Sequence, residues 1–141
     1  MKEQLGWTDI EQSKKLVETG LNPYTADMNY RYCICRCVDG EPIEDWLLGI
    51  GKLFDECPDE QIPCWSLGRL LEIIPHFVIV EGIECQLHIC PNGIGEWEVD
   101  YSDLNNDYTP FSYSDKSLLD ALFYTICSLS EHGYITERRE Q

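Results

Sequence analysis

Cysteine and histidine residues are the side chains of this sequence whose types could bind a metal ion or carry out thiol chemistry. Cys33, Cys35 and Cys37 alternate along one segment, and His88 and Cys90 form a His-x-Cys pair. Structural zinc sites usually use cysteine pairs separated by about two to four residues, and none of these pairs has that spacing. We therefore expect no metal and no cofactor. A thiol- or zinc-dependent protein built on the three alternating cysteines is the alternative.

Catalytic residues are not indicated by any motif. A cysteine nucleophile needs a base such as histidine within hydrogen-bonding reach, and no known signature of such a pair surrounds any of the eight cysteines. The chain also lacks a glycine-rich phosphate loop and a nucleophile elbow. The sequence favours a non-catalytic protein and assigns no catalytic residue.

Acidic residues dominate the charge of the chain. Ten Lys and Arg against 26 Asp and Glu give a net charge of −16. Residues 70–115 contain acidic side chains and not one lysine or arginine. Proteins that bind nucleic acid or anionic lipid do so through clustered cations, so both partners are disfavoured and a basic protein partner is favoured. The alternative is that the charge only keeps the protein soluble and monomeric.

The size and composition predict one domain, residues 1–141, with a frayed tail at residues 138–141. A core of 141 residues needs no disulfides, so we expect most of the cysteines to be reduced and buried. No apolar run approaches the roughly 20 residues that cross a bilayer, and the first residues lack the apolar segment of a signal peptide. We expect a cytoplasmic protein.

Four helical segments are predicted. A Thr8-x-x-Glu11 capping box starts a helix that runs to Thr19, and Gly20 supplies its left-handed cap. Residues 44–56 have apolar spacing that suits a short helix, although two glycines weaken it. An acidic loop follows at residues 58–63. The other two helices are residues 66–73, capped by Ser66, and residues 115–132, capped by Ser114.

Strands are predicted at residues 29–38, 76–81, 83–90 and 94–101, with a loop at residues 102–113. A three-residue loop, Pro91-Asn92-Gly93, would join the last two strands and keep their apolar faces together. The opposite face would then be acidic, and it is the candidate partner-binding surface. In this register Glu84 opposes Asp100, His88 opposes Glu96 and Gln86 opposes Glu98. The candidate partner-binding residues are Glu84, Glu96, Glu98 and Asp100.

The element order predicts an α+β fold, with helices packed on one face of an antiparallel sheet and an α-β-β-β-α order in the C-terminal part. Residues 5–16, 26–28, 63–67 and 118–135 resemble a family of small acidic proteins encoded by phages and integrated mobile elements of anaerobic gut bacteria, which has no assigned activity. The resemblance implies a genomic setting and no chemistry.

The leading hypothesis is an intracellular interaction protein of a mobile element, whose acidic surface engages a basic protein, in its sharpest form as a nucleic-acid mimic. The other reading left open, beside the thiol or zinc one, is an antitoxin-like partner of a neighbouring gene product.

Overall fold

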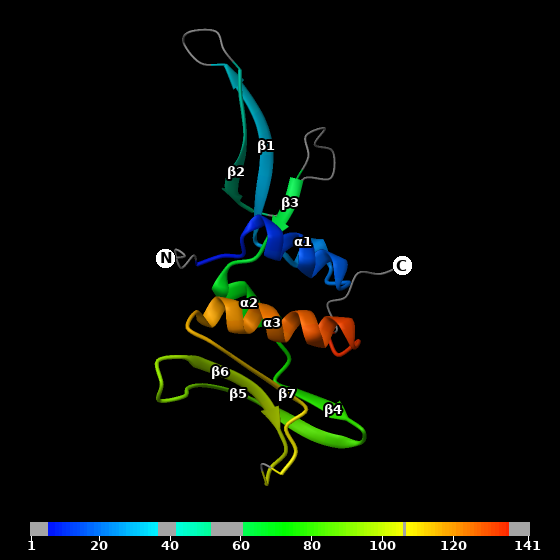
Figure 1. Ribbon diagram of the computed structural model, residues 1–141. Coiled ribbons are helices and arrows are strands. Elements are labelled where there is room, and N and C mark those ends of the chain that lie inside the picture. The colour runs from blue at the N-terminus through cyan, green and yellow to red at the C-terminus, as the bar shows by residue number, and fades with distance from the viewer. Residues whose placement is uncertain (1–5, 37–41, 52–60, 106, 136–141) are drawn as a thin grey trace.

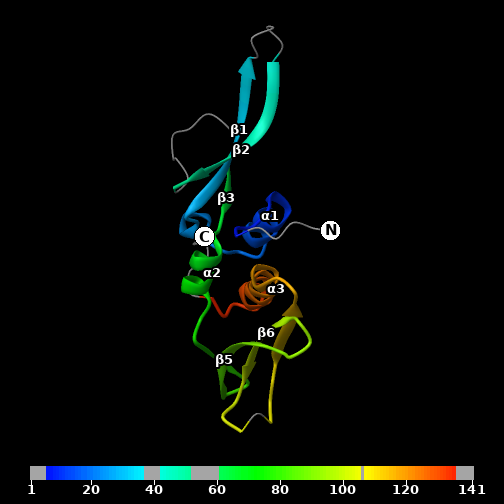
Figure 2. The same cartoon turned by 90° about the vertical axis from the view of Figure 1, so that its left-hand side faces the viewer.

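In the part of the chain that the structure describes, three α-helices and seven strands form two antiparallel sheets, which confirms the α+β class. The computed structural model describes residues 6–36, 42–51, 61–105 and 107–135, and the side chains of residues 33–36 and 42–45 lie outside this description. The helices lie between the two sheets, and the molecule is elongated (Figures 1 and 2). The sequence predicted one sheet with helices on one face, whereas the structure has two sheets, and the additional one is formed by strands within residues 28–64.

Helix α1 (Ile10–Glu18) begins one residue later than predicted. Asp9 is the N-cap, and it forms the capping box with Gln12. Thr8, the predicted cap, is buried, and its hydroxyl contacts the Ser13 hydroxyl at 2.8 Å and accepts the Trp65 amide N–H at 3.1 Å. Gly20 ends the helix with φ +101°, as predicted. The Thr8 hydroxyl is therefore used for tertiary packing, and the neighbouring carboxylate takes the cap.

The first sheet has the order β2-β1-β3. It contains β1 (Met28–Arg36), β2 (Pro42–Ile50) and β3 (Gln61–Cys64), and a 3-10 turn (Pro23–Thr25) precedes it. β1 confirms the first predicted strand as far as residue 36, and residues 37 and 38 lie outside the description. In Figures 1 and 2 the β1–β2 hairpin projects from the helices.

The predicted helix at residues 44–56 is wrong where the structure describes it, because residues 44–50 belong to β2. Trp46 pairs with Tyr32, and their rings meet edge to face at 5.2 Å between centroids. Cross-strand aromatic contacts of this kind stabilise a sheet, whereas a helix would have included two glycines. The predicted loop at residues 58–63 is also wrong at its end, where Gln61 to Pro63 pair with β1.

Helices α2 (Leu67–Ile73) and α3 (Leu118–Glu131) complete the middle layer. Ser66 caps α2 as predicted, and Trp65 before the cap and Leu70 after it are both fully buried. α3 is capped by Ser117, not by Ser114, which lies in the preceding strand. No helix in the described part of the chain is long and apolar enough to cross a lipid bilayer.

The second sheet has the order β4-β5-β6-β7. Its strands are β4 (Phe77–Val80), β5 (Ile83–Pro91), β6 (Trp97–Ser102) and β7 (Phe111–Asp115). The first three correspond to predicted strands. β7 falls mostly in the predicted loop, so the order after α2 is four strands and a helix.

The predicted register between β5 and β6 is wrong by four residues. Leu87 lies opposite Tyr101, and Ile89 lies opposite Val99. The connection is a five-residue loop, residues 92–96. The Asn92 side-chain oxygen accepts the backbone N–H groups of residues 94 and 96, and the Asn92 backbone N–H donates to the Glu96 carbonyl at 3.0 Å. A shift of four is even, so every side chain keeps its predicted face.

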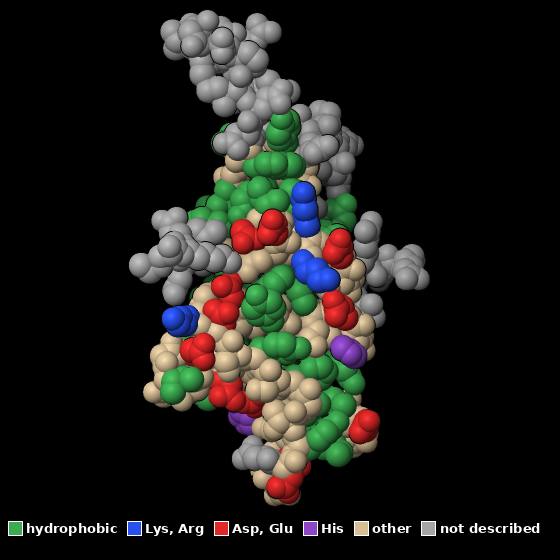
Figure 3. Space-filling model, viewed as in Figure 1, with side chains coloured by type: hydrophobic (Ala, Val, Ile, Leu, Met, Phe, Trp, Pro, Cys, Tyr) green, Lys and Arg blue, Asp and Glu red, His purple; other side chains and the backbone are tan. Residues whose placement is uncertain are grey.

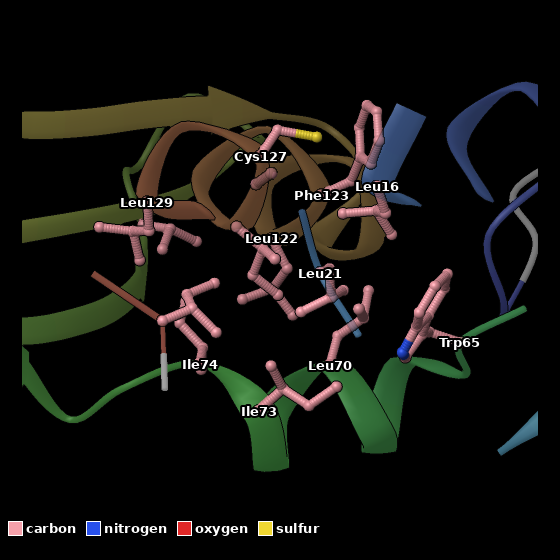
Figure 4. Packing of buried hydrophobic residues seen from close by; sticks show 14 of the residues in the cluster. Leu16, Leu21, Trp65, Leu70, Ile73, Ile74, Leu122, Phe123, Cys127 and Leu129 are labelled. Atoms are coloured by element: carbon pink, nitrogen blue, oxygen red, sulfur yellow. The ribbon is translucent and has the colours of Figure 1, made fainter. Parts of the chain in front are cut away.

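Of the two hydrophobic clusters in the described part of the chain, the smaller lies at the first sheet, and the larger joins the helices to the second sheet. Leu70 and Ile73 of α2 and Leu122 of α3 meet there, with Leu16 and Leu21 alongside them (Figure 4). The sheet contributes the side chains that alternate toward the helices. Its buried members are Val78, Cys85, Val99, Tyr101 and Phe111.

Candidate functional site

The face of the second sheet that points away from the helices carries the predicted partner-binding residues, and we call it the outer face. The alternation of each strand defines it, since core side chains at every second position leave the positions between them on the opposite side. Its members are Phe77, Ile79, Glu84, Gln86, His88, Cys90, Glu98, Asp100, Ser102, Ser112 and Ser114.

Three of the four predicted acidic residues lie on this outer face, but not in the predicted pairs. Glu84 lies opposite Ile79 of β4. Glu98 lies opposite Cys90 on one side and Ser114 on the other. Asp100 lies between His88 and Ser112 in the same way. Glu96 is in the 92–96 loop and not opposite His88.

The carboxylates of the outer face therefore have neutral residues or a histidine across from them. The expected direct opposition of like charges does not occur, which removes a destabilising contact from the sheet. Glu98 and Asp100 are two residues apart on one strand, so their Cα atoms are about 6.5–7 Å apart on the same face. Two negative charges at this spacing form an acidic strip, and a cation between them can contact both carboxylates.

Asp100 is held in place by two neighbouring side chains. Its Oδ1 lies 3.1 Å from His88 Nδ1 and 3.4 Å from Ser102 Oγ, and Ser102 Oγ lies 3.0 Å from the same His88 nitrogen. An ionised carboxylate only accepts hydrogen bonds, so the imidazole donates through Nδ1. The Asp100 side chain is 15% exposed and that of His88 is 47% exposed. The cluster is therefore an ordered acceptor at the surface.

Ser102, His88 and Asp100 do not have the arrangement of a catalytic triad. In a triad the serine and the carboxylate bind opposite nitrogens of the imidazole, so that the base can pass a proton. Here both contact Nδ1. Ser102 is also only 4% exposed, which keeps its hydroxyl from a substrate. The geometry of this cluster gives no support to hydrolysis.

The four strands of this sheet contain no lysine or arginine, since residues 70–115 contain neither. The next residue, Lys116, is exposed and directly follows the last residue of β7. Figure 3 shows red and purple side chains on the visible surface below α3, and no blue ones. Among the described cations, Lys15 of α1 contacts Glu131 of α3 at 3.6 Å, and Arg69 of α2 contacts Glu72 of the same helix at 3.0 Å. No ion pair of theirs neutralises the outer face.

The candidate metal ligands fall into two separate groups. His88 and Cys90 are exposed on β5 in the second sheet, whereas Cys33 and Cys35 belong to β1 in the first. The helices lie between the sheets, so the two groups cannot share one ion (Figure 1). The thiols of Cys33 and Cys35 and the whole of Cys37 lie outside the description. Among the described residues, no group of three or more His, Cys, Asp or Glu could hold a metal ion.

Cys64 is part of a buried polar node where β1, β3 and the start of α1 meet. Its Sγ lies 3.3 Å from the Thr8 carbonyl oxygen, which also accepts the Tyr30 hydroxyl at 2.8 Å. Burial raises the pKa of the Cys64 thiol to about 11, and it raises the pKa of Cys127 to about 12. The thiolate is the nucleophile and the metal ligand, so these two neutral thiols are structural. Of the four cysteines whose side chains are described, Cys64, Cys85 and Cys127 are buried free thiols, and Cys90 is exposed.

The raised pKa of Cys64 makes stability fall with alkali. An unfolded thiol releases its proton near its ordinary pKa of 9.0, while the buried one keeps it to about 11. Between these values the unfolded chain binds fewer protons, so the free energy of unfolding decreases as the pH rises. We expect urea unfolding from pH 8 to 10.5 to show a shallower decrease for Cys64→Ala than for the wild type. Cys90→Ala, which removes an exposed thiol, is the control; equal slopes for all three proteins would contradict the assignment.

Ser102 is the member of the site that the sequence interpretation missed. It was placed at the start of a loop, whereas it ends β6 and contacts both His88 and Asp100. The alternation of Glu98, Asp100 and Ser102 could have indicated its place, since it extends the predicted strand by one residue and puts all three side chains on one face.

Comparison of the chain with family models, curated proteins and solved structures finds no match.

Proposed function

We propose that the protein is a non-catalytic interaction protein that binds a basic partner protein through its outer face. One observation carries the proposal: Glu84, Glu98 and Asp100 share a solvent-exposed sheet face, in a stretch of chain that contains no lysine or arginine. A face of this kind attracts cations. The predicted basic partner rests on this surface and on the net charge of −16.

The ordered state of Asp100 supports a binding role beyond solubility. A charge that only keeps a protein soluble needs no fixed position, whereas Asp100 is held by His88 and Ser102. Its partial burial keeps water and salt from screening it fully, because partly buried charges are screened less than exposed ones. A lysine or arginine of a partner would meet an acceptor whose side-chain entropy is already lost.

Complementary charge would mainly speed the encounter and make binding sensitive to salt. At about 0.1 M salt the screening length is about 10 Å, so a partner must approach closely to experience the outer face. We expect the partner surface to place two or more cations at the spacing of Glu98 and Asp100. A phosphate-rich ligand is disfavoured, because its negative charges would be repelled by these carboxylates.

The proposal is tested by mapping where a cationic probe binds. Octalysine is titrated into 15N-labelled protein at 20 and 150 mM salt, and amide shifts are followed residue by residue. We expect the shifts to concentrate on the backbone of Glu84, His88, Glu98 and Asp100, and to shrink at the higher salt. Equal shifts around the exposed carboxylate Glu11 of α1 would mean that the probe responds only to net charge, and that result would contradict the proposal.

A further inference from the structure

The outer edge of β4 is open. β4 is the first strand in the order β4-β5-β6-β7, and in the described chain no other strand pairs with its far side. The Leu87 N–H donates to the His76 carbonyl at 2.9 Å, which fixes the phase of the β4–β5 ladder. Hydrogen-bonded and non-hydrogen-bonded pairs alternate in an antiparallel ladder. The peptide groups of Val78 and Val80 therefore point toward β5, and those of Phe77 and Ile79 point outward.

The same two residues also expose apolar side chains on the outer face. Phe77 is 53% exposed and Ile79 is 57% exposed. Their cross-strand neighbours on that face are Gln86 and Glu84. At Phe77 and Ile79, free backbone hydrogen-bonding groups, exposed hydrocarbon and a nearby carboxylate therefore coincide.

An edge strand of this composition is unusual for a protein that must avoid aggregation. Natural edges are normally protected by charged side chains, by proline, or by a covering segment. β4 reads Phe-Val-Ile-Val and contains none of these residues. Some proteins bind an extended peptide as an added strand on such an exposed edge. The backbone hydrogen bonds then give affinity, and the alternate side chains of the peptide give specificity.

We infer that β4 accepts an extended segment of the basic partner as an additional antiparallel strand of the second sheet. This inference rests on the function proposed above and names the form of the partner: a stretch with lysine or arginine at alternate positions. A second copy of this chain fits less well, because each copy carries a net charge of −16 and the β4 of a second copy offers no cation to Glu84.

Geometry places the cations of the added strand on the outer face. The residue that pairs with Ile79 exchanges both backbone hydrogen bonds with it, and its side chain shares the face of Ile79. Neighbouring strands are about 4.8 Å apart, so Glu84 lies about two spacings, or roughly 10 Å, from the added backbone. A lysine reaches this far when its aliphatic stem lies on the exposed Ile79 side chain and its ammonium group meets the Glu84 carboxylate.

The test uses an acetylated octapeptide of alternating lysine and threonine, which favours the extended state and carries no apolar side chain. The control peptide has the same side chains with Nα-methyl groups on its lysines, which removes the N–H groups that would face β4. We expect the wild-type protein to bind the control about tenfold more weakly or worse, with the amide of Ile79 shifted only by the unmodified peptide. Equal affinity for the two peptides would overturn strand addition.

A protein variant provides the second arm. Ile79→Pro removes an N–H that points away from β5, so the β4–β5 ladder is retained, and Ile79→Thr is the matched control that keeps the N–H. We expect Ile79→Pro to bind the octapeptide about tenfold more weakly than Ile79→Thr. If the proline variant loses its fold, the methylated peptide with wild-type protein decides. If Glu84→Gln weakens binding of the octapeptide but methylation of the peptide does not, strand addition is overturned and the proposed function stands.

If neutralising Glu84, Glu98 and Asp100 together leaves the affinity for the octapeptide unchanged, the proposed function is overturned.

Discussion

Trp65→Ala lowers the free energy of unfolding by about 3–5 kcal/mol, the range for truncating a large buried aromatic side chain. Trp65 is fully buried between β3 and α2, and in Figure 4 it lies beside Leu70. Its indole N–H donates to the Thr25 hydroxyl at 3.1 Å, and its carbonyl accepts the Thr8 amide at 2.9 Å. The side chain thus ties the buried helical layer to the 3-10 turn that precedes β1.

Urea denaturation measures this effect, with two controls. Trp65→Phe keeps most of the ring volume and loses the indole hydrogen bond, so it is expected to cost less than the alanine variant. Tyr124→Ala removes an aromatic side chain that is half exposed, and its cost is expected to be below about 1 kcal/mol. If Trp65→Ala cost no more than Tyr124→Ala, the central position of Trp65 in the core would be wrong.

Tyr101→Ala is expected to lower the free energy of unfolding by a similar amount, about 3–5 kcal/mol. Tyr101 is fully buried in β6, and its ring meets Phe111 edge to face at 6.3 Å. Its hydroxyl donates to the Pro75 carbonyl at 2.6 Å, which ties β6 to the connection between α2 and β4. Burial raises the pKa of this hydroxyl, so it stays a donor at neutral pH.

Tyr101→Phe separates the hydrogen bond from the packing. The phenylalanine variant fills nearly the same volume and leaves the Pro75 carbonyl without its donor, at an expected cost of about 1–3 kcal/mol. Thermal and urea unfolding of the two variants measure the contribution of the hydrogen bond and that of the ring packing to the free energy of unfolding. An alanine variant that is no less stable than the phenylalanine variant would mean that the ring contributes little packing.

Local signals in the sequence predicted the ends of helices better than their tertiary roles. Gly20 and Ser66 were assigned correctly, because left-handed caps and N-caps depend on residues adjacent in sequence. Thr8 and Ser114 are equally good caps by type, but one hydroxyl is used in the core and the other lies in β7. The choice between neighbouring caps is made by tertiary contacts, which local patterns do not contain.

Strand pairing was the part that the sequence did not determine. The apolar spacing of residues 44–50 fits a helix as well as a strand, and the contact of Trp46 with Tyr32 decides for the strand. The β5–β6 register has the same difficulty, since a shift of four keeps every face and only the Asn92 side chain selects the longer loop. The outer face was therefore predicted in composition, while its neighbours and the contacts of Ser102 were not.

The most direct test of the proposed function compares two triple variants that remove the same charge from different places. Glu84→Gln, Glu98→Gln and Asp100→Asn together neutralise the outer face. Glu11→Gln, Glu18→Gln and Glu131→Gln remove three exposed carboxylates from α1 and α3. Both triples take three negative charges from a chain of net charge −16, so net charge is matched. Circular dichroism and the melting temperature confirm that each variant is folded.

The measurement is the dissociation constant for octalysine at 50 mM salt. The outer-face triple is expected to weaken binding about tenfold to a hundredfold, because three contacts of about 0.5–1 kcal/mol are lost. The helix triple is expected to change it less than about threefold, since its carboxylates lie away from the bound probe. Equal losses in the two triples would show that the protein attracts cations only through its total charge, and would contradict the outer face as the binding surface.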